Sequence, residues 1–338
     1  MSQLKNKISI GRHALSNPAV LAPMSGVTDL PFRRLAARYG AGMVVSEMVA
    51  SESFVKGDAE TQMRAEAQDD GLHVVQLAGR EARWMGEAAK VIAGLGADII
   101  DINMGCPAKK VTSGYSGSAL MRDLDHALTL IEATVAAVDV PVTLKMRLGW
   151  DDNSLNAPEL ASRAEDAGVQ LITVHGRTRC QFYKGTADWS AISRVKEVIS
   201  LPLIANGDCK GVKDAQGMLE ASGADGVMIG RGAYGRPWLP GHVGHFLATG
   251  EILKAPYGGE LAELVAEHYE AILSHYGEIA GVRIARKHLG WYMDEAGAGV
   301  EPEFSGAIKK TLMTSKNPSE VLRLATEWFS SSNERTAA

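Results

Sequence analysis

Several side chains that can hold or move a proton follow short apolar runs of this chain. Cys106 lies in a Gly-Cys-Pro turn three residues beyond Asn103, and no partner at metal-ligand spacing accompanies it. A thiol in that setting serves either as a nucleophile or as a proton donor. Its ordinary pKa of about 8.5 leaves it protonated at neutral pH, which suits a donor. Cys180 and Cys209 also follow apolar runs, and for these two we expect a packing role.

Lys145 is a cation that stands inside the apolar run 142–146. A lysine that emerges from a dry interior needs a negative partner, and the ring of a reduced, anionic flavin is one. A lysine that forms a Schiff base is the alternative. No G-x-G-x-x-G follows the first apolar run, so nothing in the chain indicates a dinucleotide fingerprint.

Two glycine-containing turns offer a place for a phosphate. Asn206-Gly207-Asp208 and Gly230-Arg231-Gly232 follow the last two apolar runs. Glycine lets backbone N–H groups approach an anion closely, and Arg231 adds a guanidinium. Ordinary turns between elements are the alternative. A cofactor anchored there would extend toward Lys145 and Gln76.

The spacing of the apolar runs predicts the elements that position these side chains. Eight runs recur over about 240 residues, with room for a helix between neighbours. Such runs predict parallel strands buried on both faces, and eight units predict an α/β fold, a (β/α)8 TIM barrel, over residues 1–249. An open doubly wound sheet is the alternative. The active sites of TIM barrels lie at the carboxyl ends of the strands, where the residues named above fall. The runs are 19–22, 43–46, 74–77, 99–102, 142–146, 171–174, 203–205 and 227–229.

From about residue 250 the strand spacing gives way to helical periodicity, which predicts a small helical domain over residues 250–338. Arg283, Arg286 and Lys287 fall on one helix face there, and Trp291 and Tyr292 follow them. Cations interleaved with aromatic side chains suit contact with a nucleic-acid backbone. A solvated helix face is the alternative.

The composition limits the classes of function. The chain has 338 residues, 46% hydrophobic and 22% charged, with a net charge of −5, so it is globular and has no overall basic coat. Its three cysteines lack C-x-x-C spacing, which argues against a disulfide scaffold or a zinc site and favours the cytoplasm. Residues 1–11 contain no apolar export segment, and no run is long enough to span a membrane. No heptad seam is visible, and we expect a monomer that binds no metal.

The motifs of the chain, taken together, resemble those of the tRNA-dihydrouridine synthase family. They are most similar to its bacterial B-type and to the relatives found in nitrogen-regulation loci. The segment around Cys106 is the most specific part of the resemblance, which extends to about residue 293. The matching segments are Ala22–Asp29, Val45–Met48, Val75–Gly79, Asp101–Val111, Gly117–Leu120, Leu144–Arg147, Val174–Arg179, Ala205–Asp208, Met228–Arg231 and Arg283–His288.

The resemblance implies an enzyme that reduces a D-loop uridine of tRNA, at position 17 for the B-type, to 5,6-dihydrouridine with bound FMN and with NADPH. It implies that reduced FMN delivers a hydride to C6 of the uracil and that Cys106 protonates C5, after the uridine has left the folded RNA. Asn103 and Arg177 would hold the uracil and its phosphate, and the cationic helix face would hold the tRNA body. The FMN contacts that it implies are Pro23, Met24, Ser25, Gln76, Lys145, His175, Asn206, Gly207, Asp208, Gly230 and Arg231.

The chain departs from the family pattern at two places. Ser25 stands where the family usually has alanine, and the segment 112–116 is less basic than in B-type relatives. Two other classes of function stay open. An FMN-barrel oxidoreductase for a free pyrimidine would have little need of the cationic helix face. A non-catalytic RNA-binding regulatory protein would have no reason to keep both Lys145 and Cys106.

Overall fold

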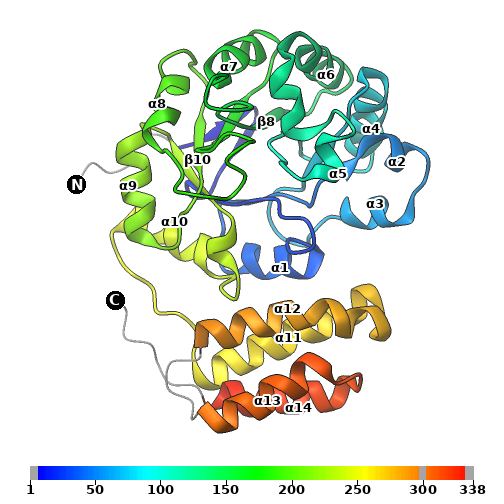
Figure 1. Ribbon diagram of the computed structural model, residues 1–338, viewed down its shortest axis with the longest axis vertical. Coiled ribbons are helices and arrows are strands. Elements are labelled where there is room, and N and C mark those ends of the chain that lie inside the picture. Colours follow the sequence, from blue (N-terminus) through cyan, green and yellow to red (C-terminus); the bar gives the residue numbers. More distant parts are fainter. Residues whose placement is uncertain (1–6, 297–301, 332–338) are drawn as a thin grey trace. The chain divides into compact units, whose positions relative to one another are not determined.

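The apolar runs pair as one parallel sheet in the computed structural model, which describes residues 7–296 and 302–331 (Figure 1). Nine strands follow one another in the order β4-β3-β11-β10-β9-β8-β7-β6-β5. A parallel bridge between Val45, just after β4, and Val74 of β6 closes the barrel, and β5 pairs with β6 farther along, so that β4 and β5 together form one of eight barrel strands. The predicted (β/α)8 barrel is confirmed. The strands are β3 Ala19–Leu21, β4 Met43–Val44, β5 Val49–Ala50, β6 Val74–Ala78, β7 Ile99–Met104, β8 Val142–Arg147, β9 Leu171–His175, β10 Leu203–Asn206 and β11 Gly226–Ile229.

Helices connect the strands and cover the outside of the barrel (Figure 1). Gly96 and Gly168 follow helices α4 and α7 with φ of +95° and +98°, so the chain leaves each helix in the left-handed conformation and enters the next strand. The α-helices are α1 Leu30–Arg38, α2 Ser51–Val55, α3 Ala59–Arg64, α4 Ala82–Gly94, α5 Lys109–Thr112, α6 Leu124–Ala136, α7 Ala157–Asp166, α8 Ser190–Lys196, α9 Val212–Ser222 and α10 Leu239–Thr249. Short 3-10 helices occupy Gly117–Arg122 (η1) and Arg231–Ala233 (η2). No described helix is long and apolar enough to cross a membrane.

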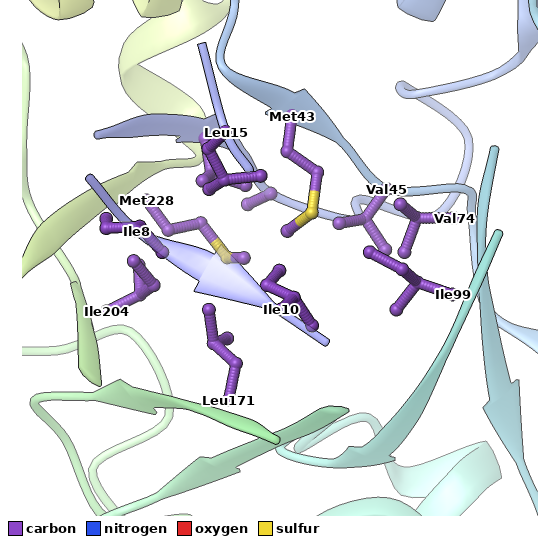
Figure 2. Close-up of a cluster of buried hydrophobic side chains, with 12 residues drawn as sticks. Ile8, Ile10, Leu15, Met43, Val45, Val74, Ile99, Leu171, Ile204 and Met228 are labelled. Atoms are coloured by element: carbon purple, nitrogen blue, oxygen red, sulfur yellow. The ribbon is translucent and has the colours of Figure 1, made fainter. Parts of the chain in front are cut away.

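A hairpin that the apolar runs did not predict closes the barrel at the amino ends of its strands. Strands β1 (Ser9–Ile10) and β2 (His13–Ala14) pair antiparallel, and they bring Ile8, Ile10 and Leu15 into a buried cluster. Figure 2 shows these side chains among residues from the first positions of the barrel strands, including Val74, Ile99 and Leu171. The apolar layer therefore fills the amino ends of the strands, and the polar interior residues are left at the carboxyl ends.

The remaining helices form a second compact unit. It comprises α11 (Gly258–Tyr276), α12 (Glu278–Ala296), α13 (Pro302–Thr314) and α14 (Pro318–Ser330), together with the segment Ala233–Trp238. The strand spacing assigned that segment to the barrel. It groups with the helices because the rings of Tyr234 and Trp291 stack with their centroids 4.0 Å apart.

Two histidines are buried inside the helical unit. His268 of α11 contacts His288 of α12 with ring centroids 4.9 Å apart, and His268 Nδ1 lies 3.0 Å from the hydroxyl of Tyr292. Burial lowers the pKa of His268 to about 3. Burial, with the charges of His268 and Lys287, holds the pKa of His288 well below its usual value. Both rings are therefore neutral in the folded unit.

The helical unit should lose stability as the pH falls below about 6.5. Each histidine takes up a proton on unfolding, so the free energy of unfolding falls by about 1.4 kcal/mol per pH unit per histidine between roughly pH 6 and pH 4. Hydrogen exchange of the α11 amides, corrected for intrinsic rates, measures this change. His288→Leu leaves only His268 to take up a proton on unfolding. The opening free energy of this variant should therefore decrease less steeply than that of the wild type as the pH is lowered. Equal slopes for wild type and variant would contradict the assignment.

Candidate active site

A chain of hydrogen bonds between interior side chains crosses the carboxyl end of the barrel. Asp101 accepts from Thr143 Oγ1 at 2.6 Å and from Gln76 Nε2 at 2.7 Å. Gln76 Oε1 then accepts from Asn103 Nδ2 at 2.7 Å. Burial raises the pKa of Asp101 to about 6, which leaves it a carboxylate at neutral pH. Since a carboxylate only accepts, Asp101 fixes the orientation of both amide groups.

The loop that carries Cys106 is held from three sides. Asn103 Oδ1 accepts from the N–H groups of Gly105 and Cys106 at 3.1 and 2.9 Å. Ser118 donates to the Cys106 carbonyl through its hydroxyl at 2.8 Å and through its backbone N–H at 3.0 Å. Arg147 Nε donates to the Gly105 carbonyl at 2.8 Å. Burial raises the pKa of the Cys106 thiol above its usual value, so the sulfur retains its proton at neutral pH.

Lys145 and His175 both donate to one oxygen of Asn206. Lys145 Nζ lies 3.2 Å and His175 Nδ1 lies 2.8 Å from Asn206 Oδ1, and Asn206 Nδ2 donates to the Met228 carbonyl at 2.7 Å. This orientation places the proton of His175 on Nδ1 and leaves Nε2 as an acceptor. Burial, with the charges of Arg147 and Lys145, holds the pKa of His175 well below its usual value. Burial beside Arg147 lowers the pKa of Lys145 to about 8.

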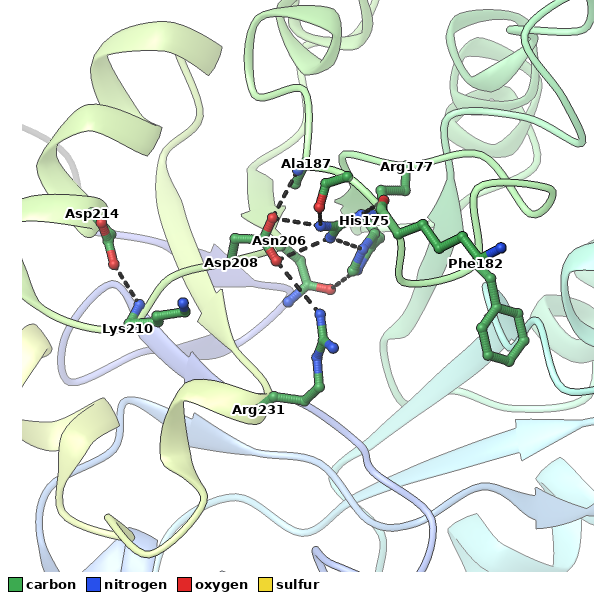
Figure 3. A network of polar contacts seen from close by, with 12 residues as sticks. His175, Arg177, Phe182, Ala187, Asn206, Asp208, Lys210, Asp214 and Arg231 are labelled. Atoms are coloured by element: carbon green, nitrogen blue, oxygen red, sulfur yellow. Dashed lines mark hydrogen bonds and ion pairs between the residues drawn. The ribbon is translucent and has the colours of Figure 1, made fainter. Parts of the chain in front are cut away.

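Arg177 was expected to bind substrate, and the structure gives it a different role. Its side chain is 1% exposed and forms a two-pronged ion pair with Asp208, with N–O distances of 3.0 and 2.6 Å (Figure 3). Its other N–H groups point to the carbonyls of Lys184 and Gly185 and to His175 Nε2. All five donors of the guanidinium are used. Arg177 therefore positions the turns around it, and none of its donors is left for a uracil or its phosphate.

The two glycine-containing turns meet through Asp208. Its φ is +58°, an uncommon conformation outside glycine, and Arg231 Nη2 lies 3.5 Å from its Oδ1 (Figure 3). Burial alone would raise the pKa of Asp208, but the hydrogen bonds from Arg177 and from the Ala187 N–H hold it below its usual value. Asp208 is thus a charged carboxylate, paired with Arg177 and Arg231, that holds the two turns together. Arg231 is 48% exposed and still has donors available.

The loop after β3 carries three predicted cofactor contacts, Pro23, Met24 and Ser25. Its Gly26 N–H donates to a carboxylate oxygen of Glu47, which is buried just beyond β4. A side chain at Gly230 would meet only the Met24 sulfur and the Ala22 methyl within 4 Å, at 3.7 and 3.8 Å. The backbone at Gly230 is therefore accessible next to this loop.

Two further residues of the barrel mouth lay outside the predicted set. Arg147 donates to the carbonyls of Thr178 and Phe182, each at 2.9 Å, as well as to the cysteine loop. Burial lowers the pKa of Arg147 to about 10, so it stays charged. Tyr183 is 44% exposed, and the guanidiniums of Arg147 and Arg231 lie 5.5 and 4.7 Å from its ring centroid. Strand alternation could have found Arg147, because it follows Lys145 by two positions on the same face of β8.

The cationic helix face belongs to the helical unit. Arg283 is exposed and Lys287 is half-buried on α12. Arg286 is half-buried and donates to the carbonyls of Thr314 and Ser315 at 3.3 and 3.1 Å. The C-terminal carbonyls of a helix lack partners within the helix, so Arg286 stabilises the end of α13. The prediction that all three cations contact RNA assumed that Arg286 projects freely, and these hydrogen bonds hold it against the protein instead.

The barrel and its site define a class of enzyme. The mouth holds a protonated thiol, a lysine whose charge is opposed by burial, and two turns beside a half-exposed arginine, so it is suited to an anionic cofactor. Within residues 7–296 and 302–331, no three His, Cys, Asp or Glu side chains gather where they could hold a metal ion. The fold and the site are those of a TIM-barrel enzyme, with its polar side chains gathered at the carboxyl ends of the strands.

Comparisons with known proteins identify the family. The family model described as Dihydrouridine synthase (Dus) matches residues 9–331. A probable tRNA-dihydrouridine synthase of Rhizobium leguminosarum bv. phaseoli is 60% identical over 91% of this chain and 94% of its own length. A protein of the same name from Rhodobacter capsulatus is 55% identical over 98% and 99%, and the tRNA-dihydrouridine synthase B of Pseudomonas putida is 48% identical over 87% and 88%. The chain belongs to the dihydrouridine synthase family, and the resemblance drawn from its motifs is confirmed.

Solved structures with the same fold are much more distant in sequence. Histamine dehydrogenase from Rhizobium sp. 4-9 superposes with a TM-score of 0.56 at 15% identity, over 80% of this chain and 51% of its own. Morphinone reductase in complex with tetrahydroNAD gives 0.50 at 14% identity, over 77% and 94%. At these identities the likeness shows the barrel fold alone.

Asp101→Asn should loosen the cysteine loop, because an amide no longer fixes which way Gln76 and Asn103 point. We expect a loss of about 1–3 kcal/mol in stability from the mispaired buried groups. In a Cys180→Ser background, Cys106 should also react faster with iodoacetamide. Thr143→Val removes the other hydrogen bond to Asp101 and is the matched control, with an alkylation rate close to that of the parent. If both variants alkylate at the same rate, Asp101 does not position the loop.

Proposed function

We propose that this protein is a tRNA-dihydrouridine synthase of the cytoplasm that acts as a monomer. It reduces the C5–C6 bond of a D-loop uridine, at position 17, with bound FMN and with NADPH as reductant. The observation that carries the proposal is the Cys106 thiol, which burial keeps protonated and which three groups hold at the barrel mouth. The family membership of the chain supports the same reaction.

The residues of the mouth fit FMN. Lys145 is a cation whose pKa burial lowers to about 8, so an anionic ring beside it would raise that pKa and stabilise the charge. The backbone at Gly230 is accessible, and Arg231 is half-exposed, so both can meet a phosphate. Asp208 and Gly207 contribute by shaping the first turn. We propose as FMN contacts Pro23, Met24, Ser25, Gln76, Lys145, His175, Asn206, Gly207, Asp208, Gly230 and Arg231.

The chain's own groups then supply the proton and orient the base. The bound flavin supplies the hydride that saturates the double bond. Cys106 donates its proton to C5 of the uracil, and Asn103 keeps the cysteine backbone in place. Asn103 Nδ2 donates to Gln76 Oε1 and, at 4.0 Å, to the Met48 sulfur, a weak acceptor that an oxygen of the uracil edge would replace. A uridine must leave its RNA stack to reach these groups.

An anaerobic half-reaction experiment tests the function. The flavin-loaded protein is reduced with NADPH and mixed with tRNA that lacks dihydrouridine, and the flavin absorbance is followed. We expect reoxidation with a matching loss of uridine at position 17. Reoxidation by a free pyrimidine but not by tRNA would indicate a small-molecule oxidoreductase. Binding of tRNA without flavin uptake would indicate a regulatory protein.

Cys106→Ala tests the proton donor. We expect the variant to bind flavin and to be reduced by NADPH at the wild-type rate, because the thiol takes no part in that half. Reoxidation by tRNA should slow by about 10²–10⁴-fold, the usual contribution of a positioned acid. Cys180→Ala, an exposed thiol on another loop, is the control and should react like the wild type. Unchanged reoxidation in Cys106→Ala would remove Cys106 from the mechanism.

A further inference from the structure

Four side chains beside the cysteine loop form an alternating stack of aromatic rings and guanidiniums, which we call the Trp150 stack. Arg122 lies 5.2 Å from the ring centroid of Tyr115 and 4.4 Å from that of Trp150. Arg179 lies 4.8 Å from the same Trp150 centroid. The four residues come from three separate loops or turns of the barrel unit. One indole thus holds two cations of like charge close together.

The two arginines of the stack have no carboxylate partner among the described residues. Across the described residues, no ion pair is found for Arg122 or Arg179, and Arg179 has one side-chain hydrogen bond, to Thr112 Oγ1 at 3.4 Å. Most other arginines near the surface meet a carboxylate. Such pairs are Arg34–Asp69, Arg64–Glu60, Arg83–Glu87, Arg163–Asp125 and Arg323–Glu327.

The way in which these guanidiniums are held leaves their donors free. A salt bridge occupies N–H donors of a guanidinium, whereas the ring contacts of Arg122 and Arg179 place no carboxylate or carbonyl oxygen against them. The stack therefore orders Arg122 and Arg179 while most of their N–H groups stay available. Two such groups side by side suit an anion whose oxygens accept several hydrogen bonds, and a phosphate is the strongest of these in biology.

The stack is joined to the loop that carries Cys106. Tyr115 belongs to that loop, which runs from Cys106 to Gly117 and places Lys109 and Lys110 at the surface. The Cys180 N–H donates to the Trp150 carbonyl at 2.9 Å, and the Arg179 N–H donates to the Gly149 carbonyl at 3.0 Å. An anion bound by the stack therefore lies at the edge of the reacting site.

We propose that Arg122 and Arg179, ordered by Trp150, bind a backbone phosphate of the RNA close to the uridine that enters the site. The proposal rests on the proposed function, since it names a contact of that substrate. Arg177 is fully occupied, and the stack provides the unpaired cations that a phosphate beside the barrel mouth requires. Binding there also relieves the repulsion between the two guanidiniums.

The salt dependence of tRNA binding tests the proposal. Filter binding of tRNA to the flavin-loaded protein is measured over a series of salt concentrations for the wild type and for Arg122→Gln/Arg179→Gln. Each lost phosphate contact reduces the salt slope by about 0.7–0.9, and the two arginines share one phosphate, so the double variant should lose about that amount. Trp150→Leu keeps both charges, so it should weaken binding several-fold and leave the slope unchanged. Lys90→Gln, an exposed cation on the outer helix α4, is the control and should change neither quantity.

Each other outcome decides a separate point. An unchanged slope in the double variant overturns the proposal, provided that the variant binds flavin and unfolds at the wild-type temperature. A raised KM for NADPH with unchanged tRNA binding would assign the stack to the reductant instead and would also overturn it. A wild type that binds tRNA with the expected slopes but does not reduce uridine would remove the proposed function and keep the phosphate site. A wild type that does not bind tRNA overturns both.

Discussion

The buried guanidinium of Arg147 is the interaction on which the mouth of the barrel depends. It donates to the carbonyl of Gly105, next to Cys106, and to the carbonyls of Thr178 and Phe182 in the loop after β9. One side chain on a rigid strand therefore sets the distance between the thiol and the opposite loop. A buried cation is costly unless its donors are used, and backbone carbonyls satisfy Arg147 without adding a negative charge to the site. Burial lowers the pKa values of Lys145 and His175, and the positive charge of Arg147 lowers both further.

The apolar layer at the amino ends of the barrel strands stabilises the barrel, which leaves the carboxyl ends free to carry polar side chains. Ile8 and Ile10 of the amino-terminal hairpin close the amino end of the barrel, where they pack against Val74, Ile99 and Leu171 at the starts of three strands. The strand pairing continues from that layer up to Asn103 and Lys145, which are register partners on neighbouring strands. Stability and chemistry thus occupy different layers of the same eight strands, and the backbone hydrogen bonds transmit the rigidity of one to the other.

The sequence predicts the strands and the end of the barrel at which the polar groups lie, because both depend on the order of apolar and polar residues within each short segment. Eight apolar runs fix the strands, and a residue two positions beyond another on a strand faces the same side. The uses of individual donors do not follow from pattern. Arg177 stands in a motif beside His175, yet its five donors are consumed by His175 itself, by Asp208 and by the carbonyls of a loop that no periodicity describes. Likewise Arg286 has helical spacing to its neighbours, but its partners are carbonyls 28 and 29 residues away. The hairpin escaped prediction because its strands have only two residues each.

The arginines of the barrel mouth differ in whether hydrogen bonds or aromatic rings hold their guanidiniums. Arg147 and Arg177 are held through their N–H edges, and an edge that is satisfied by the protein cannot recognise a ligand. Arg122 and Arg179 are held against the Trp150 ring, and among the described residues neither forms an ion pair. Since one residue type serves both purposes in adjacent loops, burial and charge alone do not separate a structural arginine from a binding one. The number of occupied N–H donors does separate them. By this measure Arg147 and Arg177 have a structural role, and the arginines of the Trp150 stack are the ones that can bind the substrate.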